Sequence, residues 1–127
     1  MTCQILVTED NELIREHIKE ELEERGYNIC TTENGQSCLD QIKKSIPDIL
    51  ILDIMMEGIT GMEVIRKLKQ TKRTKNIYII ANTIITKDSR EGQTIASFVD
   101  AYIEKPARID VLMSAVKNGV EYIKSRP

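Results

Sequence analysis

Short apolar runs alternate with amphipathic stretches along the whole chain. A strand buried in a parallel sheet reads as an unbroken aliphatic run, and the runs in this chain predict strands at residues 5–7, 27–31, 49–52, 77–81 and 101–103. The stretches between them carry apolar residues at helical spacing. They predict a helix between an Asn11 N-cap and Gly26, a second that Gly35 opens and Pro47 closes, and three more at 62–71, at 88–98 and from Ile109 to Ile123.

Strands that alternate with helices across short loops predict a parallel sheet covered on both faces. We therefore expect a flavodoxin-like α/β fold, a doubly wound (βα)5 arrangement with strand order 2-1-3-4-5. A length of 127 residues corresponds to one domain. No linker, repeat or low-complexity segment interrupts the pattern, so residues 1–127 are predicted to form a single domain.

Polar residues follow several of these strands, at the carboxyl ends where open α/β sheets bind their ligands. Asp53 comes directly after the run at 49–52, and Glu9 and Asp10 follow the first strand. Thr83 follows the fourth strand and Lys105 the fifth. The first and third strands are neighbours in the expected order, so the three carboxylates should meet in one crevice.

Three acidic groups in one crevice repel one another unless a cation lies among them. Mg²⁺, a hard cation that prefers oxygen ligands, fits this need, with Mn²⁺ as an alternative. Asp10 and Asp53 are the expected direct ligands, and Glu9 assists directly or through water. Asp53 can then act as a nucleophile toward a phosphoryl group, while Lys105 and the Thr83 hydroxyl contact phosphoryl oxygens.

Composition narrows the classes of function. A formal net charge of −2 argues against nucleic-acid binding, since such domains carry an excess of Lys and Arg. No apolar stretch is long enough for a bilayer and the N-terminus lacks a signal-peptide pattern, so we expect a cytoplasmic protein without a membrane partner. Cys3, Cys30 and Cys38 lack CxxC spacing and are interpreted as small buried hydrophobic residues. A zinc site is not expected, because the chain has a single histidine, His17, and scattered thiols. His17 itself is interpreted as part of a solvated helix face.

As an ordered set, these residues resemble the receiver domains of two-component response regulators, and the resemblance covers essentially the whole chain. The loop DIMMEGITG that starts at Asp53 matches the family's phosphoacceptor loop, and the spacing from Asp53 to Thr83 and Lys105 is typical of it. The matching positions are the acidic pair Glu9-Asp10, the phosphoacceptor Asp53, the switch residues Thr83 and Tyr102, and the pair Lys105-Pro106. Any one of these motifs is weak, whereas the ordered set is specific.

The resemblance implies Mg²⁺-dependent phosphorylation of Asp53 from the phosphohistidine of a sensor histidine kinase or a histidine phosphotransfer protein. It also implies a further metal ligand in the Met55 backbone carbonyl and a cis peptide bond before Pro106. Self-phosphorylation from donors and slow autodephosphorylation are the only reactions implied, so the chain is expected to be a signalling phosphoacceptor and not an enzyme. Thr83 and Tyr102 are implied to move on phosphorylation and to shift the face of the fourth helix, fifth strand and fifth helix. That face would bind a downstream protein target or a fused effector domain.

Several positions depart from the family pattern. Glu57 stands where a proline is usual and adds a carboxylate near the expected metal site. Ile84 replaces a small residue after the switch threonine, and we expect it to narrow access to the acyl phosphate and slow its hydrolysis. Phe98-Val99 replace the usual Gly-Ala, so the fourth helix must end without a glycine. Gly92, inside that helix, costs about 1 kcal/mol relative to alanine.

Two other functions are compatible with the same fold. The first is a pseudo-receiver that binds partners without phosphorylation, which Glu9, Glu57 and Ile84 favour mildly. The second is a flavin carrier, although the acidic Glu9-Asp10 pair would repel a flavin phosphate and no phosphate-cradling loop follows the first strand. The basic stretch at 66–75 is interpreted as a solubilising face or a partner patch. The chain can be a single-domain regulator or part of a longer one.

Overall fold

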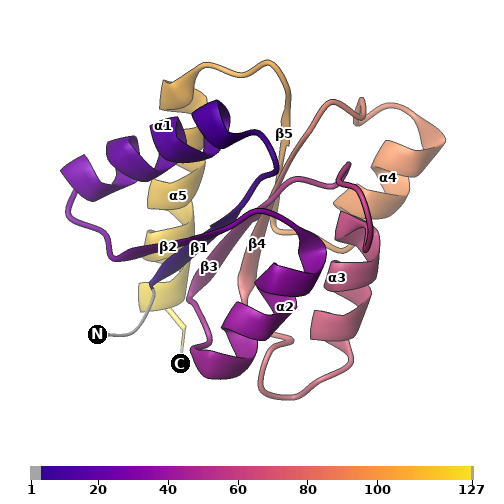
Figure 1. Cartoon of the computed structure of the whole chain (residues 1–127), viewed down its shortest axis with the longest axis horizontal. Helices are drawn as coiled ribbons and strands as arrows, with labels where there is room; N and C mark the ends of the chain where they lie inside the picture. Colours follow the sequence, from indigo (N-terminus) through magenta and orange to yellow (C-terminus); the bar gives the residue numbers. More distant parts are fainter. Residues whose placement is uncertain (1–3, 127) are drawn as a thin grey trace.

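The computed structural model describes residues 4–126, which form a five-stranded parallel sheet (Figure 1). The strands are β1 (Ile5–Thr8), β2 (Ile29–Thr32), β3 (Ile49–Leu52), β4 (Tyr78–Thr83) and β5 (Ala101–Glu104). Hydrogen-bonded neighbours follow the order β2-β1-β3-β4-β5, and every neighbouring pair is parallel. The predicted flavodoxin-like topology is therefore confirmed.

A helix follows each strand and returns the chain to the end of the sheet at which the strands begin. The helices are α1 (Glu12–Glu24), α2 (Gly35–Lys44), α3 (Gly61–Lys69), α4 (Arg90–Ala96) and α5 (Ile109–Lys124). Helices α1 and α5 cover one face of the sheet, and α2, α3 and α4 cover the other (Figure 1). This winding brings the carboxyl ends of all five strands to one edge. Within residues 4–126, no helix has both the length and the apolar character needed to cross a membrane.

Strand β3 lies at the centre of the core and is buried on both of its faces. Leu50 and Leu52 belong to the apolar cluster under α2, α3 and α4, whereas Ile49 and Ile51 belong to the cluster under α1 and α5. These four side chains are at most 1% exposed. The unbroken aliphatic run thus fills two apolar layers, and the chain reaches the carboxyl edge of the sheet at residue 53.

Both ends of α1 follow the sequence prediction. The Asn11 side-chain oxygen accepts a hydrogen bond from the Ile14 N–H at 3.0 Å, as an N-cap does. At the other end Arg25 is the C-cap, and Gly26 adopts a φ of 88°. Glycine takes this left-handed conformation without steric penalty, so the chain can turn sharply from α1 toward β2.

Strand β4 is longer than the sequence prediction of 77–81. The apolar run ends at Ala81, but Asn82 and Thr83 continue the strand and pair with Ile103 and Glu104. Both polar residues are buried. Backbone pairing with β5 sets this boundary, and hydropathy does not reveal such pairing. Thr83 is therefore the last residue of the strand, not the first residue of the loop that follows it.

Helix α4 has seven residues and is shorter than the predicted 88–98. The Ser89 hydroxyl caps it by accepting a hydrogen bond from the Gly92 N–H at 3.0 Å. A Cβ at position 92 would overlap the Thr86 carbonyl oxygen, so the loop can fold against α4 because residue 92 is glycine. At its far end the Phe98 N–H donates to the Ile95 carbonyl at 2.9 Å, and the helix ends without a glycine, as expected.

The described cysteines carry free thiols. Cys38 on α2 is fully buried, and burial raises the pKa of its thiol to about 11. This confirms the interpretation of Cys38 as a small hydrophobic residue. Cys30 on β2 is only half-buried, and Cys3 lies outside the described residues.

Candidate functional site

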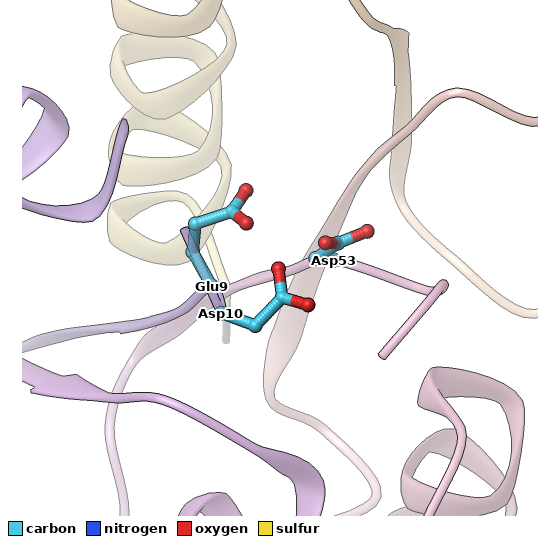
Figure 2. Close-up of side chains that lie close together, drawn as sticks. All are labelled: Glu9, Asp10 and Asp53. Atoms are coloured by element: carbon cyan, nitrogen blue, oxygen red, sulfur yellow. The ribbon is translucent and has the colours of Figure 1, made fainter. Parts of the chain in front are cut away.

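Three carboxylates converge at the carboxyl edge of the sheet. Strands β1 and β3 pair in register, with Thr8 opposite Leu52, so the residues that follow them leave the sheet side by side. Glu9, Asp10 and Asp53 each offer an oxygen within 4.8 Å of the others. Figure 2 shows the three side chains gathered at this point. The structure therefore confirms that the three acidic side chains converge.

The three carboxylates have different surroundings. Glu9 is 2% exposed and Asp53 5% exposed, whereas Asp10 is open to solvent. Glu9 Oε2 accepts a hydrogen bond from the Asn11 N–H at 3.1 Å, and Asp53 Oδ1 accepts one from the Met55 N–H at 3.1 Å. Backbone donors therefore fix two of the acids, while Asp10 faces the solvent from which a ligand would arrive.

Lys105 supplies the positive charge nearest to the acids. Its Nζ donates to Glu9 Oε1 at 2.5 Å and to Asp53 Oδ2 at 3.3 Å. The backbone directs it there, because the Lys105 N–H donates to the Thr83 carbonyl at 2.8 Å and so continues the pairing of β5 with β4. The following bond, Lys105–Pro106, is cis, as the resemblance implied. One ammonium group thus bridges two buried carboxylates from separate strand ends.

Burial dominates the protonation behaviour of this cluster. It raises the pKa of Asp53 above that of an ordinary aspartate, against the lowering effect of Lys105 and of the Met55 N–H. It raises the pKa of Glu9 in the same way, against the hydrogen bonds from Lys105 and Asn11. Burial alone would lower the pKa of Lys105, but its bond to Glu9 and the charge of Asp53 outweigh burial and raise it. One lysine therefore lies among three carboxylates and contacts two of them.

The donor set fits a hard divalent cation. All three side chains are carboxylates, one is solvent-facing, and Mg²⁺ typically binds one or two carboxylates together with water and phosphate oxygens. Burial raises the pKa of both Asp53 and Glu9, and a bound cation would favour their ionised forms. Within residues 4–126, Glu9, Asp10 and Asp53 are the one group of three such side chains arranged for a metal ion.

The loop after Asp53 is held by close backbone contact with the start of α3. The Gly61 N–H donates to the Ile54 carbonyl at 3.0 Å, and a Cβ at Gly61 would lie 2.5 Å from the Ile54 Cα. Thr60 caps the helix by accepting from the Glu63 N–H at 3.2 Å. The loop is therefore anchored at both ends although Glu57, which is exposed, replaces the usual proline.

Thr83 and Tyr102 both bind the backbone of Ile85. The Thr83 hydroxyl accepts from the Ile85 N–H at 3.3 Å, and the Tyr102 hydroxyl donates to the Ile85 carbonyl at 2.7 Å. Thr83 is fully buried and Tyr102 is half-buried. Ile84, which lies between Thr83 and Ile85 in the chain, is 62% exposed and lines a cleft that also includes Lys105. Ile85 therefore connects the Thr83 hydroxyl to the Tyr102 hydroxyl.

The structure brings the sequence-predicted residues together at one edge of the sheet. It also adds a contact that the sequence did not suggest: the Arg15 guanidinium donates to the Glu9 carbonyl at 2.8 Å and helps hold the acidic turn. An arginine one turn into an amphipathic helix usually faces solvent, so its spacing alone carries no signal. For Met55 the structure shows its N–H bound to Asp53, and the role of its carbonyl stays a prediction.

Comparison with known sequences identifies the family. A family model described as the response regulator receiver domain matches residues 5–117. The chain is 29% identical over 118 residues to the polar-differentiation response regulator DivK of Brucella ovis, covering 93% of this chain and 96% of that protein. It is 32% identical over 117 residues to the phosphate regulon transcriptional regulatory protein PhoB of Rhizobium meliloti, covering 92% of this chain and 52% of that one. The chain thus spans about half the length of PhoB.

Solved structures agree with the sequence comparison. The signal receiver domain of a signal transduction histidine kinase from Syntrophus aciditrophicus matches with a TM-score of 0.88 at 29% identity, covering 99% of this chain and 96% of that one. The response regulator protein TrrA of Thermotoga maritima, solved in complex with Mg²⁺–BeF, matches with a TM-score of 0.79 at 36% identity, covering 93% and 99%. The chain therefore belongs to the receiver domains of two-component response regulators.

Proposed function

We propose that this domain is a phosphoacceptor that receives a phosphoryl group on Asp53 from the phosphohistidine of a partner protein. A carboxylate oxygen of Asp53 attacks the phosphorus atom, and an O–P bond forms as the N–P bond breaks. The bonding electrons stay on the imidazole nitrogen of the partner, which takes up a proton. Attack of water on the acyl phosphate later releases inorganic phosphate and restores the Asp53 carboxylate.

The observation that carries this proposal is the position of the Asp53 carboxylate between acids and a lysine. Lys105 Nζ lies 3.3 Å from Asp53 Oδ2, and its reach allows it to follow an oxygen of a phosphoryl group on Asp53. Met55 holds the other carboxylate oxygen through its N–H. These contacts orient the nucleophile and place positive charge where the transferred group would arrive.

Mg²⁺ is the proposed cofactor, with Mn²⁺ as an alternative. Asp10 and Asp53 would hold it directly, with Glu9 assisting and the Met55 carbonyl as a further ligand. When bound, the cation would supply positive charge opposite the phosphoryl oxygens. TrrA, which is 36% identical, was solved with Mg²⁺–BeF, and this supports a divalent cation in this chain.

Phosphorylation is proposed to change the surface formed by α4, β5 and α5. A phosphoryl oxygen on Asp53 gives the buried Thr83 hydroxyl a new acceptor, in competition with its present bond to the Ile85 N–H. The loop would then move toward Asp53 and carry away the Ile85 carbonyl to which Tyr102 donates. Tyr102 would reorient as a result, and the balance between two conformers of this surface would shift.

The proposed partners follow from this chemistry. A sensor histidine kinase or a histidine phosphotransfer protein would donate the phosphoryl group, and a downstream protein or a fused effector domain would read the altered surface. The names of DivK and PhoB, a response regulator and a transcriptional regulatory protein, are consistent with either kind of output. We place the domain in the cytoplasm, as one folding unit over residues 1–127.

The acyl phosphate can be mapped chemically. The protein is incubated with phosphoramidate and Mg²⁺, reduced with borohydride, which converts an aspartyl phosphate to homoserine, and digested for peptide sequencing by mass spectrometry. We expect conversion at Asp53 and none in a parallel sample with EDTA. Conversion of Asp10 to homoserine, or reduction of Glu9 to hydroxynorvaline, in place of conversion at Asp53 would refute the assignment of the phosphoacceptor.

A further inference from the structure

The segment 66–75 has a charge unlike the rest of the chain. It contains six of the 18 Lys and Arg residues and none of the 20 Asp and Glu residues. The nearest acids along the chain are Glu63 before it and Asp88 after it. Helix α2 contributes Lys43 and Lys44 in its last turn. A chain with a net charge of −2 therefore concentrates positive charge on one part of its surface.

Three of these cations line a groove between α2 and α3, helices that pack side by side on one face of the sheet (Figure 1). The groove has a volume of about 410 Å³, and its apolar walls are Leu39, Ile42, Ile46 and Leu68. Its charged lining residues are Lys43, Lys67 and Arg73, and no lining residue is acidic. We call this feature the α2–α3 basic groove.

The cations of the α2–α3 basic groove are free to bind a ligand. Lys43, Lys67 and Arg73 are exposed, and none of the three forms an ion pair within residues 4–126. Two of the apolar wall residues, Leu39 and Ile46, are only half-buried. The groove thus combines uncompensated positive charge with accessible apolar surface.

The cations of the α2–α3 basic groove lie toward the opposite end of the sheet from the acidic cluster, although Gln36, in the first turn of α2, lines both the groove and a cleft that includes Asp10. Both α2 and α3 run back from the carboxyl edge of the sheet, so their last turns and the segment after α3 lie toward the opposite edge. The surface of α4, β5 and α5 is also separate, because none of its residues lines the groove. A ligand could therefore occupy the groove while Asp53 and its neighbours remain accessible.

We propose that the α2–α3 basic groove binds an acidic, amphipathic peptide segment of a partner protein. Carboxylates of the segment would pair with Lys43, Lys67 and Arg73, and its apolar side chains would cover Leu39 and Ile46. A single-stranded nucleic acid fits less well, since no aromatic residue lines the groove for base stacking. A membrane surface also fits less well, because the groove is concave and the large exposed hydrophobic side chains all lie on other parts of the described surface.

Binding can be measured by fluorescence anisotropy with a fluorescein-labelled peptide of sequence EELLEEIEELLEE on the full chain. The test variant is Lys43→Glu/Lys67→Glu/Arg73→Glu. The matched control, Lys87→Glu/Arg90→Glu/Lys117→Glu, makes the same change in net charge at exposed positions outside the groove. A second variant, Leu39→Ala, tests the apolar contact without changing charge. Circular dichroism and Asp53 phosphorylation show that each variant is folded.

We expect saturable binding that weakens as salt increases. The groove variant should raise Kd about tenfold or more, because it loses three local charge pairs with the peptide. The control variant should raise Kd about twofold or less, because it loses only long-range electrostatic attraction. Leu39→Ala should raise Kd about threefold. No saturable binding, or equal affinity for the groove variant and the control, would overturn the proposal. Tighter binding of a single-stranded RNA or of phosphatidylserine vesicles through the same three cations would overturn it in favour of those ligands.

Discussion

Lys105 is the residue on which the electrostatic balance of the acidic cluster depends. It joins two carboxylates that are nearly inaccessible to solvent, Glu9 and Asp53. Each acid has one backbone N–H donor, and one ammonium group cannot neutralise both charges. The cluster therefore gains from a bound cation, and its stability should respond to metal, to pH and to loss of the lysine.

Lys105→Met should destabilise the metal-free protein. Removal of one partner of a buried ion pair costs about 3–5 kcal/mol, and the partial exposure of Lys105 reduces the expected loss to about 1–3 kcal/mol. Urea unfolding in EDTA measures this loss, with Lys87→Met at an exposed position as control. Mg²⁺ should reduce the difference in unfolding free energy between Lys105→Met and wild type, because it supplies the missing positive charge. Equal stability of the two variants in EDTA would show that Lys105 carries no such role.

The effect of Mg²⁺ on stability should depend on pH. The pKa of Glu9 and of Asp53 is raised in the folded protein, mainly by burial. In the window between the ordinary and the raised pKa, the folded state binds more protons than the unfolded state, so without metal their contribution to stability falls as pH rises. A metal ion requires both groups ionised, and Mg²⁺ should therefore raise Tm most above this window.

Thermal unfolding with and without Mg²⁺, from about pH 8 down to about pH 4.5, tests this expectation. The rise in Tm should shrink as protons compete for the carboxylates, and Asp53→Asn should weaken it at every pH. A rise in Tm that is independent of pH, or unchanged in Asp53→Asn, would mean that Mg²⁺ stabilises the protein elsewhere.

Among the structural elements, the loop from Asp53 to α3 controls how the central carboxylate is presented. Gly61→Ala should displace this loop, since the new methyl group would contact the Ile54 Cα at 2.5 Å. We expect a loss of about 1–3 kcal/mol in unfolding free energy and slower phosphorylation of Asp53. Gly58→Ala provides a comparison in the same loop, because a side chain there strains a backbone with a φ of 80° but meets open space around its Cβ. Phosphorylation of Gly61→Ala at the wild-type rate would contradict this view of the loop.

The loop between β4 and α4 offers a second test at this scale. Ile84 is 62% exposed and lines the same cleft as Lys105, so its branched side chain can limit the approach of water to an acyl phosphate. Ile84→Ala should shorten the lifetime of phosphorylated Asp53 several-fold with little change in stability. The decay of the phosphorylated protein, followed by intact mass, gives this rate. If phosphorylated Ile84→Ala loses its phosphoryl group no faster than wild type, Ile84 does not limit the hydrolysis of the acyl phosphate.

For the whole molecule, much of the fold could be predicted because burial determines where apolar residues occur along the sequence. The unbroken run at Ile49–Leu52 marks a strand covered on both faces, and alternation with helices fixes a parallel sheet. That topology then brings Glu9, Asp10 and Asp53 to one edge. The acidic cluster was predictable because it depends on strand order and on which residues follow the strands.

The features that the sequence did not reveal arise from tertiary contacts between polar groups. The extension of β4 to Thr83 depends on pairing with β5, and the need for Gly92 depends on the approach of the Thr86 carbonyl. The link between Thr83 and Tyr102 passes through the backbone of Ile85. Neither hydropathy nor helical spacing encodes such contacts, because they depend on exact backbone positions and not on residue type.

The function proposed for the whole molecule depends on phosphorylation of Asp53, which intact mass spectrometry can detect. Wild type and Asp53→Asn are each incubated with acetyl phosphate, with Mg²⁺ or with EDTA, and with phosphoramidate as a second donor. We predict that, with each donor, wild type with Mg²⁺ gains one phosphoryl group and the other three samples gain none. An equal gain in Asp53→Asn would contradict phosphorylation of Asp53. No gain from either donor, in wild-type protein that is folded and binds Mg²⁺, would also contradict it and would favour a phosphorylation-independent binding module.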